Sequence, residues 1–371
     1  SPAVEDLVSD GEPNRSFWAN QRVWLSGHTG FKGAWLAEWL LHMGAEVHGF
    51  ALAPQHERCP HLALGHDSRL ASERHADLRD RAAVEASITD ARPTIVLHLA
   101  AQALVRAAYR APVETFATNV LGTVHVLDAL RRAPELDAAV FVTTDKVYEN
   151  REWAWGYRES DRLGGHDPYA ASKAACEIAI ASYRDSFFDR PTRLPSARAG
   201  NVIGGGDWAA ERLLPDCMRA FAEGRPAAIR RPHAIRPWQH VVEPLRGYLM
   251  LAERAAQDAL PAAAYNFGPD LADCRPVAQV VQLAAQHWGG GAGWNDCSDP
   301  AEPMHETHVL RLDASLAREI GWKPRIDLSR AVGLTVEWYR AQHEGADRPA
   351  LIERTRAQID QVSAGTSHDR R

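Results

Sequence analysis

Tyr169 and Lys173 are the residues in this sequence whose types and spacing most directly suggest catalysis. Four residues are about one helical turn, so the two side chains would lie on one face of a helix. An ammonium beside a phenol favours the negative form of the phenol and lowers its pKa. Such a phenol can take the proton of an alcohol. The spacing is common by chance, so its meaning depends on the residues upstream.

A glycine-rich turn near the start of the chain is the second signal. The apolar run 22–26 leads into GHTGFKG, which places Gly27, Gly30 and Gly33 in a GxxGxxG pattern before a helix expected over 31–43. Glycines let the backbone approach a pyrophosphate, and the helix N-terminus offers free N–H groups and a positive dipole end. Strand, glycine turn, helix and strand within about 30 residues predict a dinucleotide site.

The residues that should distinguish NAD from NADP are less informative. NAD-binding sites usually have an acid at the end of the second strand. Here the strand expected at 45–50 is followed by no acid before Glu57, and Arg58 beside it could favour a 2′-phosphate. Asp77 could meet an adenine amino group or cap the helix expected over 79–90.

The alternation of expected strands and helices predicts an α/β fold with a doubly wound parallel sheet of the Rossmann type. The site should lie at the carboxyl ends of the strands. Ala100 and Ala101 follow the buried strand expected at 94–99, where small side chains would let a cofactor lie across the strand end. Polar residues 144–146 follow the next apolar run, 138–142.

The domain organisation follows from changes in composition along the chain. We expect a flexible leader at 1–16 and a Rossmann domain at 17–200, to which a strand near 264–268 returns. A smaller substrate-binding domain should occupy most of 201–342, interleaved with the first. A disordered tail is expected at 343–371, where apolar residues are few.

Charge and cysteine content exclude several classes of protein. The formal net charge is -6, which gives no sign of a nucleic-acid or membrane-surface partner. Apolar runs fall short of the roughly 18 residues of a membrane span. The five cysteines are scattered without a CxxC pair, which favours reduced thiols in the cytoplasm over disulfides or a zinc site. We therefore expect a cytoplasmic protein without a metal ion.

Basic residues in the second half could bind a further diphosphate. The stretch 229–239 reads IRRPHAIRPWQ and contains Arg231 and Arg236, and Arg212 lies shortly upstream. Guanidinium groups bind phosphate oxygens through paired hydrogen bonds. A solvated basic loop is the alternative interpretation.

Several motifs appear in order over residues 17–339. They are GHTGFKG, HLAAQ, TTDK, EWAWGYRE, DPYAASK, RAGNVIGGGDW and RPWQHVVEPLRGY. In these motifs the chain resembles the extended short-chain dehydrogenase/reductases, and within them the nucleotide-sugar 4,6-dehydratases that act on CDP-glucose. The glycine motif and Tyr-x-x-x-Lys mark only the superfamily. Lys146 separates the sequence from related dehydratases acting on TDP-glucose, which carry Asp-Glu there.

The resemblance implies an internal redox cycle on a CDP-hexose, CDP-D-glucose, with NAD as the cofactor. Tyr169 would take the 4-OH proton while hydride passes from C4 to NAD+. Lys173 would hold the ribose and lower the pKa of Tyr169, and Thr144 would hydrogen-bond the 4-oxygen. Loss of the C5 proton and of water from C6, with Asp145 as the acid, would precede return of the hydride to C6.

The resemblance also implies binding residues and an oligomeric state. The cofactor contacts would be Gly27, Thr29, Gly30, Phe31, Gly33, Asp77, Leu78, Ala100, Ala101, Tyr169 and Lys173. The substrate diphosphate would meet Asn201 and Arg236, with Arg212 as a weaker candidate. The family resemblance favours NAD over NADP. It also implies a homodimer in which the helices at 112–132 and 169–188 pair with their mates.

Asp145 and Lys146 present a conflict of charge. Asp145 needs a raised pKa to act as an acid near neutral pH, yet an adjacent ammonium would lower that pKa. Lys146 could be deprotonated and act as the C5 base if it were desolvated. Alternatively it is a structural ammonium that pairs with a carboxylate such as Glu149.

Two other activities fit much of the same pattern. A nucleotide-sugar epimerase of this fold needs Tyr169, Lys173 and the cofactor, but no acid for water loss; Asp145 and Lys146 together argue against it. A 4,6-dehydratase acting on a different nucleotide hexose is the other alternative, because no residue in the sequence identifies the base.

Overall fold

The computed structural model describes residues 11–190, 193–298 and 309–364, which are built around a seven-stranded sheet. Its strands are β1 (Arg22–Ser26), β2 (Glu46–Ala51), β3 (Ser72–His75), β4 (Ile95–His98), β5 (Ala138–Val142), β6 (Ser196–Ala199) and β10 (Ala264–Phe267). Their order is β10-β6-β5-β4-β1-β2-β3, and all neighbours are parallel. The chain runs outward from β1 to β3 and then returns to β4. This reversal makes the crevice in which doubly wound sheets bind ligands, and it confirms the predicted fold class.

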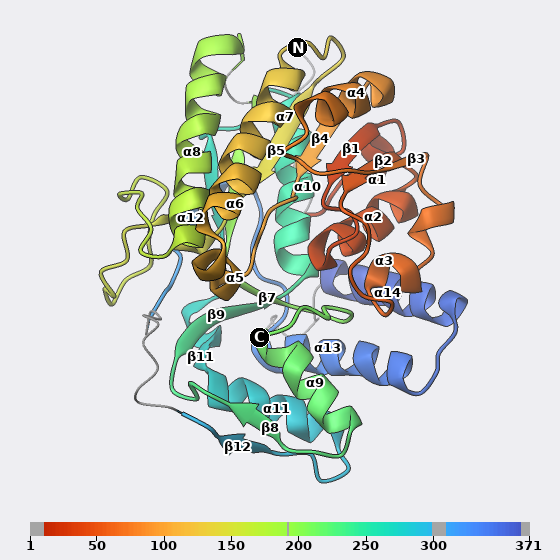
Figure 1. The fold of residues 1–371 in the computed structure, drawn as a ribbon, viewed down its shortest axis with the longest axis vertical. Helices are drawn as coiled ribbons and strands as arrows, with labels where there is room; N and C mark the ends of the chain where they lie inside the picture. The colour runs from red at the N-terminus through yellow and green to blue at the C-terminus, as the bar shows by residue number, and fades with distance from the viewer. Residues whose placement is uncertain (1–10, 191–192, 299–308, 365–371) are drawn as a thin grey trace.

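Helices cover both faces of this sheet (Figure 1). One layer contains α2 (Phe31–Met43), α10 (Val242–Ala256) and α14 (Arg348–Ala364), and the other contains α4 (Arg81–Ala91), α7 (Gly122–Leu130) and α8 (Pro168–Phe187). Alternate residues of β1 point to opposite faces. Val23 and Leu25 therefore pack into one buried cluster and Trp24 into another. Within the described part of the chain, no helix is long and apolar enough to cross a membrane.

Shorter helices connect these layers. They are α1 (Arg15–Trp18), α3 (Pro60–Ala63), η2 (His66–Ser68), α5 (Val105–Arg110), α6 (Pro112–Phe116), the π-helical turn η3 (Ala117–Leu121) and η4 (Asp145–Val147). The predicted helix at 112–132 is thus formed by α6, η3 and α7 in succession.

The second half of the chain adds two small sheets, which lie below the main sheet in Figure 1. The strands are β7 (Asn201–Ile203), β8 (Ala227–Ile229), β9 (Ile235–His240), β11 (Cys274–Pro276) and β12 (Trp294–Asp296), in the orders β11-β9-β7 and β12-β8. The helices are α9 (Leu213–Ala222), η6 (Leu271–Asp273), α11 (Val277–Trp288), α12 (Ser315–Glu319) and α13 (Leu328–His343). The domain boundary expected at residue 200 stays a prediction, since one buried cluster includes both Val23 and Trp338.

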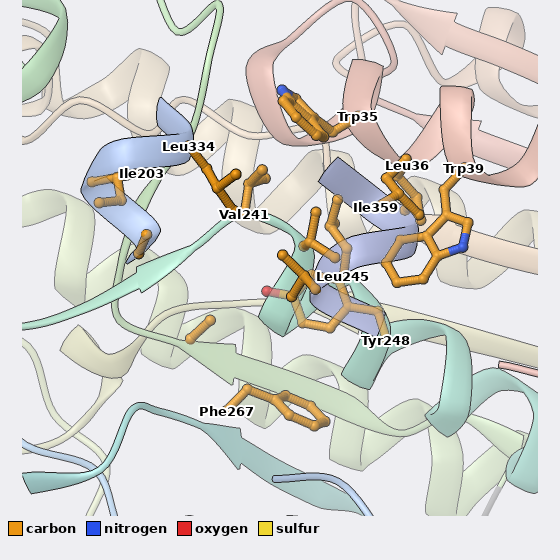
Figure 2. Close-up of a cluster of buried hydrophobic side chains, with 14 of the residues drawn as sticks. Trp35, Leu36, Trp39, Ile203, Val241, Leu245, Tyr248, Phe267, Leu334 and Ile359 are labelled. Carbon is orange, nitrogen blue, oxygen red and sulfur yellow. The ribbon is translucent and has the colours of Figure 1, made fainter. Parts of the chain in front are cut away.

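The prediction of a disordered tail is wrong for Arg348–Ala364, which forms helix α14. Ile359 of α14 is buried in the same cluster as Leu36 and Trp39 of α2 and Leu245 of α10 (Figure 2). A few apolar residues on one face are enough to hold a helix against a preformed surface. Residues 365–371 lie outside the described part.

The described portion of the expected leader is also structured. Asn14 caps α1 by accepting hydrogen bonds from the backbone N–H groups of Ser16 and Phe17. The guanidinium of Arg246, which is fully buried, donates a hydrogen bond to the carbonyl of Gly11. The sequence predicted that ordered structure begins near Phe17, but it begins earlier, at or before Asn14. Residues 1–10 lie outside the described part.

A buried ion pair fixes helix α8 against the sheet. Glu177 of α8 and Arg198 of β6 are joined by an Oε2–Nη2 contact of 2.8 Å, and Ser196 donates to the same oxygen at 2.7 Å. Arg198 also donates through Nη1 to the hydroxyl of Tyr148 at 2.8 Å. Burial alone would raise the pKa of Glu177, but the charge and hydrogen bonds of Arg198 outweigh it and the pKa is lowered.

We expect Glu177→Gln to lower the free energy of unfolding by about 3–5 kcal/mol, because it leaves Arg198 buried without its charge partner. The loss should appear as a lower urea midpoint with an unchanged slope. The folded-state pKa of Glu177 lies below the ordinary glutamate value of 4.5. The stability it contributes is therefore complete above that value, and the advantage of the wild type should vanish as pH falls through the lowered folded-state pKa.

Glu85→Gln is the matched control. Glu85 Oε1 lies 2.6 Å from Arg132 Nη1, but the two side chains are 43% and 58% exposed. Exposed ion pairs contribute at most about 1 kcal/mol. Equal losses in the two variants would contradict the argument from burial.

Candidate active site

The glycine turn after β1 leaves no room for side chains. Gly27 has a φ of +77°, and a Cβ there would lie 2.8 Å from the backbone nitrogen of Ala100. A Cβ on Gly33 would lie 2.0 Å from the carbonyl oxygen of Gly27. Gly30 is the N-cap of α2, whose first backbone N–H groups have no acceptor within the helix. The turn thus forms a bare backbone cradle at a helix N-terminus, which fits a dinucleotide pyrophosphate.

Thr29 and Phe31 flank this cradle. Thr29 Oγ1 donates to the carbonyl oxygen of Leu52 at 2.9 Å, which ties the turn to the end of β2. Phe31 is partly buried, and its ring lies close to Gly204, where a Cβ would come within 3.0 Å of Phe31 Cζ. The glycine-rich loop after β7 therefore packs against the start of α2.

Asp77 and Leu78 follow β3, as expected. The prediction that Asp77 could cap the next helix is wrong, because Asp80 caps α4 by accepting from Ala83 N at 3.0 Å. Asp77 instead accepts from the backbone N–H of Arg79 at 2.8 Å and from its guanidinium, which lowers the pKa of Asp77. Leu78 is buried.

The end of β4 is held by two side chains. Ser26 Oγ accepts from the backbone N–H of Ala100 at 3.1 Å, and Ala101 follows, partly buried. Asn119, in the π-helical turn η3, accepts from Gln102 N at 2.8 Å and donates to Ser172 Oγ on α8 at 2.9 Å. Asn119 therefore connects this strand end to the helix that carries Tyr169 and Lys173.

Tyr169 and Lys173 are both buried on α8. Lys173 Nζ donates to the carbonyl oxygen of Val142, at the end of β5, at 3.0 Å. Burial raises the pKa of Tyr169 to about 12, and the charge of Asp145 also raises it, against a hydrogen bond with Thr144 that lowers it. Desolvation therefore outweighs the neighbouring charges at Tyr169, and the ammonium of Lys173 is directed at Val142, so a lowering of the Tyr169 pKa by Lys173 stays a prediction.

Thr144 and Asp145 lie just beyond β5 and are buried. Thr144 caps the turn η4, and its Oγ1 donates to Asp145 Oδ1 at 3.0 Å. Burial raises the pKa of Asp145, although Lys146, the Thr144 hydrogen bond and Arg236 all lower it. Asp145 Oδ2 is buried and has no hydrogen-bond partner among the described residues. Desolvation thus outweighs the neighbouring positive charges in its effect on the pKa of Asp145.

Lys146 is partly buried beside Asp145. Glu149, which the sequence offered as a structural partner for Lys146, instead pairs with Arg162 at 3.0 Å and with Arg151 at 3.3 Å. The charge of Lys146 instead lowers the pKa of Asp145.

Lys32 is a site residue that the sequence analysis missed. It lies in the first turn of α2, and its Nζ is 3.5 Å from the hydroxyl of Tyr248. Burial lowers the pKa of Lys32 to about 7, and the charge of Arg212 lowers it further while that of Asp145 raises it. The signal was present in GFKG, where a lysine lies in the first turn of the helix, between two glycines of the cradle.

Three residues were predicted to bind a diphosphate. The charges of two of them, Arg212 and Arg236, shift the pKa values of Tyr169 and Asp145. Arg236 of β9 is buried and its charge lowers the pKa of Asp145. Arg212 pairs with Asp207 Oδ2 through Nη1 at 3.1 Å, and its charge lowers the pKa of Tyr169. Asn201 opens β7, which runs parallel to β9.

The family model of the NAD dependent epimerase/dehydratase family matches residues 23–268. The chain is 43% identical to the CDP-glucose 4,6-dehydratase of Salmonella typhimurium, over 95% of this chain and 99% of that protein. It is 26% identical to the dTDP-glucose 4,6-dehydratase of Neisseria gonorrhoeae, over 71% of this chain and 79% of that protein. The solved UDP-glucose 4-epimerase of Thermus thermophilus, in complex with NAD, has a TM-score of 0.72 and 25% identity over 87% of this chain and 99% of that one.

Proposed function

Because the chain belongs to the NAD-dependent epimerase/dehydratase family, we propose that it converts CDP-D-glucose to CDP-4-keto-6-deoxy-D-glucose and water, with NAD as its cofactor. The observation that carries this proposal is Asp145, a buried carboxyl with a raised pKa beside Thr144 and Tyr169. Loss of water from C6 needs an acid, whereas an epimerase has no leaving group to protonate. The identity of 43% to a CDP-glucose 4,6-dehydratase supports the choice of nucleotide.

The proposed cofactor site is the cradle of Gly27, Gly30 and Gly33, which fits a pyrophosphate without side-chain clashes. NAD supplies the chemistry of a hydride acceptor that takes a hydride from C4 and gives it back to C6. In this proposal Lys173 hydrogen-bonds the nicotinamide ribose, for which its position at the end of β5 is suitable. The acid that usually marks NAD-binding sites at the end of β2 is missing. The choice of NAD over NADP is therefore supported by the family and by the relatives.

Tyr169 is the proposed base for the 4-OH proton, and Thr144 the proposed hydrogen-bond donor to the 4-oxygen. The pKa of about 12 means that the phenol of Tyr169 is neutral at pH 7. Positive charge brought close to the phenol favours its anion. Arg212 already acts in this direction.

Asp145 is the proposed acid that protonates the departing C6 hydroxyl, and Lys146 the proposed base for C5. The ketone at C4 acidifies the C5 proton, so a modest base is sufficient. Lys32 is a rival for this role, since its pKa of about 7 matches a base at neutral pH. Asn201, Arg212 and Arg236 are proposed to bind the substrate diphosphate.

The first prediction from this proposal concerns the substrate. Incubated with NAD+ and each of CDP-, TDP-, UDP- and GDP-glucose, the protein should remove one water from CDP-glucose alone, as measured by mass spectrometry. Water loss from another nucleotide sugar would keep the mechanism and overturn the substrate. An inverted sugar stereocentre without water loss, detected by NMR, would make the protein an epimerase.

The second prediction identifies the C5 base. In D2O, Lys146→Met should slow deuterium incorporation at C5 by about a hundredfold or more, because general bases contribute rate factors of that size. Oxidation at C4 precedes this step, so NADH absorbance should still develop and report an intact site. Lys32→Met is the matched comparison, and it should retain the exchange. If Lys32→Met lost the exchange while Lys146→Met kept it, the role of base would pass to Lys32.

We also propose that the protein is a homodimer that works in the cytoplasm, where its five free cysteines would stay reduced. Large apolar side chains are exposed on the adjacent elements α5, α6, η3 and α8, along one side of the molecule in Figure 1. They are Tyr109, Val113, Phe116, Leu121, Ile178 and Phe187. Exposed apolar patches of this kind mark protein interfaces.

Val113 and Ile178, which are 75% and 63% exposed, test this interface. The double variant Val113→Asp/Ile178→Asp should be monomeric by sedimentation velocity, since it would bury charges in an apolar contact. Leu271→Asp, at a residue 64% exposed on η6, is the control and should remain a dimer. A monomeric wild type, or a double variant that remains dimeric, would contradict the proposed surface.

A further inference from the structure

Three histidines converge on one carboxylate at the outer edge of the main sheet. His28 comes from the glycine turn, His61 from α3, and Glu73 and His75 from β3. Their Nε2 atoms lie 2.6 Å (His28), 3.0 Å (His61) and 2.9 Å (His75) from Glu73 Oε1. All four potential ligand atoms lie within 4.8 Å of one another. β3 is the edge strand of the main sheet, and Figure 1 shows α3 on the same side of the molecule.

Hydrogen bonding alone is a poor account of this cluster. One carboxylate oxygen has two lone pairs, whereas three ring nitrogens approach Glu73 Oε1. His61 is fully buried, and neither of its ring nitrogens has a hydrogen-bond partner among the described residues. The same holds for Nδ1 of His28. Buried polar atoms are normally paired, so several orphaned imidazole nitrogens at one place need an explanation.

The donor set suits a transition metal. Imidazole nitrogens bind a metal through the lone pair of the neutral ring. Three nitrogens and one carboxylate oxygen make a four-ligand set of the kind that Zn2+ binds in tetrahedral sites. Ligands of this type suit Zn2+, Ni2+ or Cu2+ better than Mg2+ or Ca2+.

We propose that these four side chains bind one divalent ion of the Zn2+ class. The ion would join the glycine turn to α3 and β3, three segments that are separate in the sequence. With four protein ligands the site is closed, which is typical of a structural rather than a catalytic metal. No ligand spacing in the sequence pointed to it, and the expectation of no metal rested on the absence of a CxxC pair.

The test uses the full chain without a histidine tag, stripped with a chelator and dialysed against Zn2+. Elemental analysis should find one ion per chain. Titration of the stripped protein with Co2+ should give the strong visible absorption of a tetrahedral site. Zn2+ should also raise the unfolding temperature, because it binds only the folded chain.

His75→Ala is the informative variant, since the His75 side chain is 40% exposed and its loss should leave the fold intact. Changes to residues that only hydrogen-bond a metal ligand already weaken metal binding about 10–100-fold, so loss of a ligand itself should weaken Zn2+ binding at least tenfold. The Zn2+-dependent rise in unfolding temperature should disappear with it. Circular dichroism of the stripped variant checks that it is folded.

His48→Ala is the matched control on the neighbouring strand. His48 Nδ1 contacts Ser72 Oγ at 2.8 Å and lies outside the cluster. This variant should bind one ion as tightly as the wild type. A wild type that retains no stoichiometric ion, or a folded His75→Ala that binds Zn2+ like the wild type, would overturn the proposal. None of these measurements depends on the proposed enzymatic activity.

Discussion

The buried ion pair between Glu177 and Arg198 is the contact on which the geometry of the candidate site depends. Tyr169, Lys173 and Glu177 are spaced four residues apart, so they share one face of α8. Because the pair holds Glu177 against β6, Tyr169 and Lys173 on the same helix face point toward the carboxyl ends of the strands. Thr143, at the end of β5, donates to the same carboxylate and adjoins Thr144 and Asp145. The same ion pair therefore supports both the stability of the fold and the position of the reactive groups.

Around that frame, desolvation decides the charge state of each reactive group. Burial raises the pKa of Asp145 by more than the neighbouring cations lower it. Burial also keeps Tyr169 neutral, with a pKa of about 12, and brings Lys32 down to about 7. In water at pH 7 an aspartate is ionised and a lysine is charged, whereas a tyrosine is neutral there as well. Burial thus favours the proposed acid role of Asp145 and a basic role for Lys32, whereas at Tyr169 it opposes the proposed role of base.

The sequence predicted the fold because local patterns specify it. The glycine turn and the alternation of apolar runs with amphipathic segments are short-range signals, and the doubly wound parallel sheet was predicted from them. The site was predicted as a set of residues but not as a set of charge states, since burial arises from contacts distant in sequence. For the same reason Lys32 was missed and the tail was misjudged: Ile359 becomes a core residue only when α2 and α10 are present.

Burial shifts pKa values in opposite directions at the candidate active site and at the histidine cluster: it raises the pKa of Asp145 and lowers that of His61. At Asp145 burial favours the protonated carboxyl, and at His61 it favours the unprotonated ring, because in each case the neutral form is the one that avoids desolvation of a charge. A neutral carboxyl can donate a proton, and a neutral imidazole can donate a lone pair. One physical effect therefore acts both on the acid proposed at the strand ends and on a ligand proposed at the β3 edge.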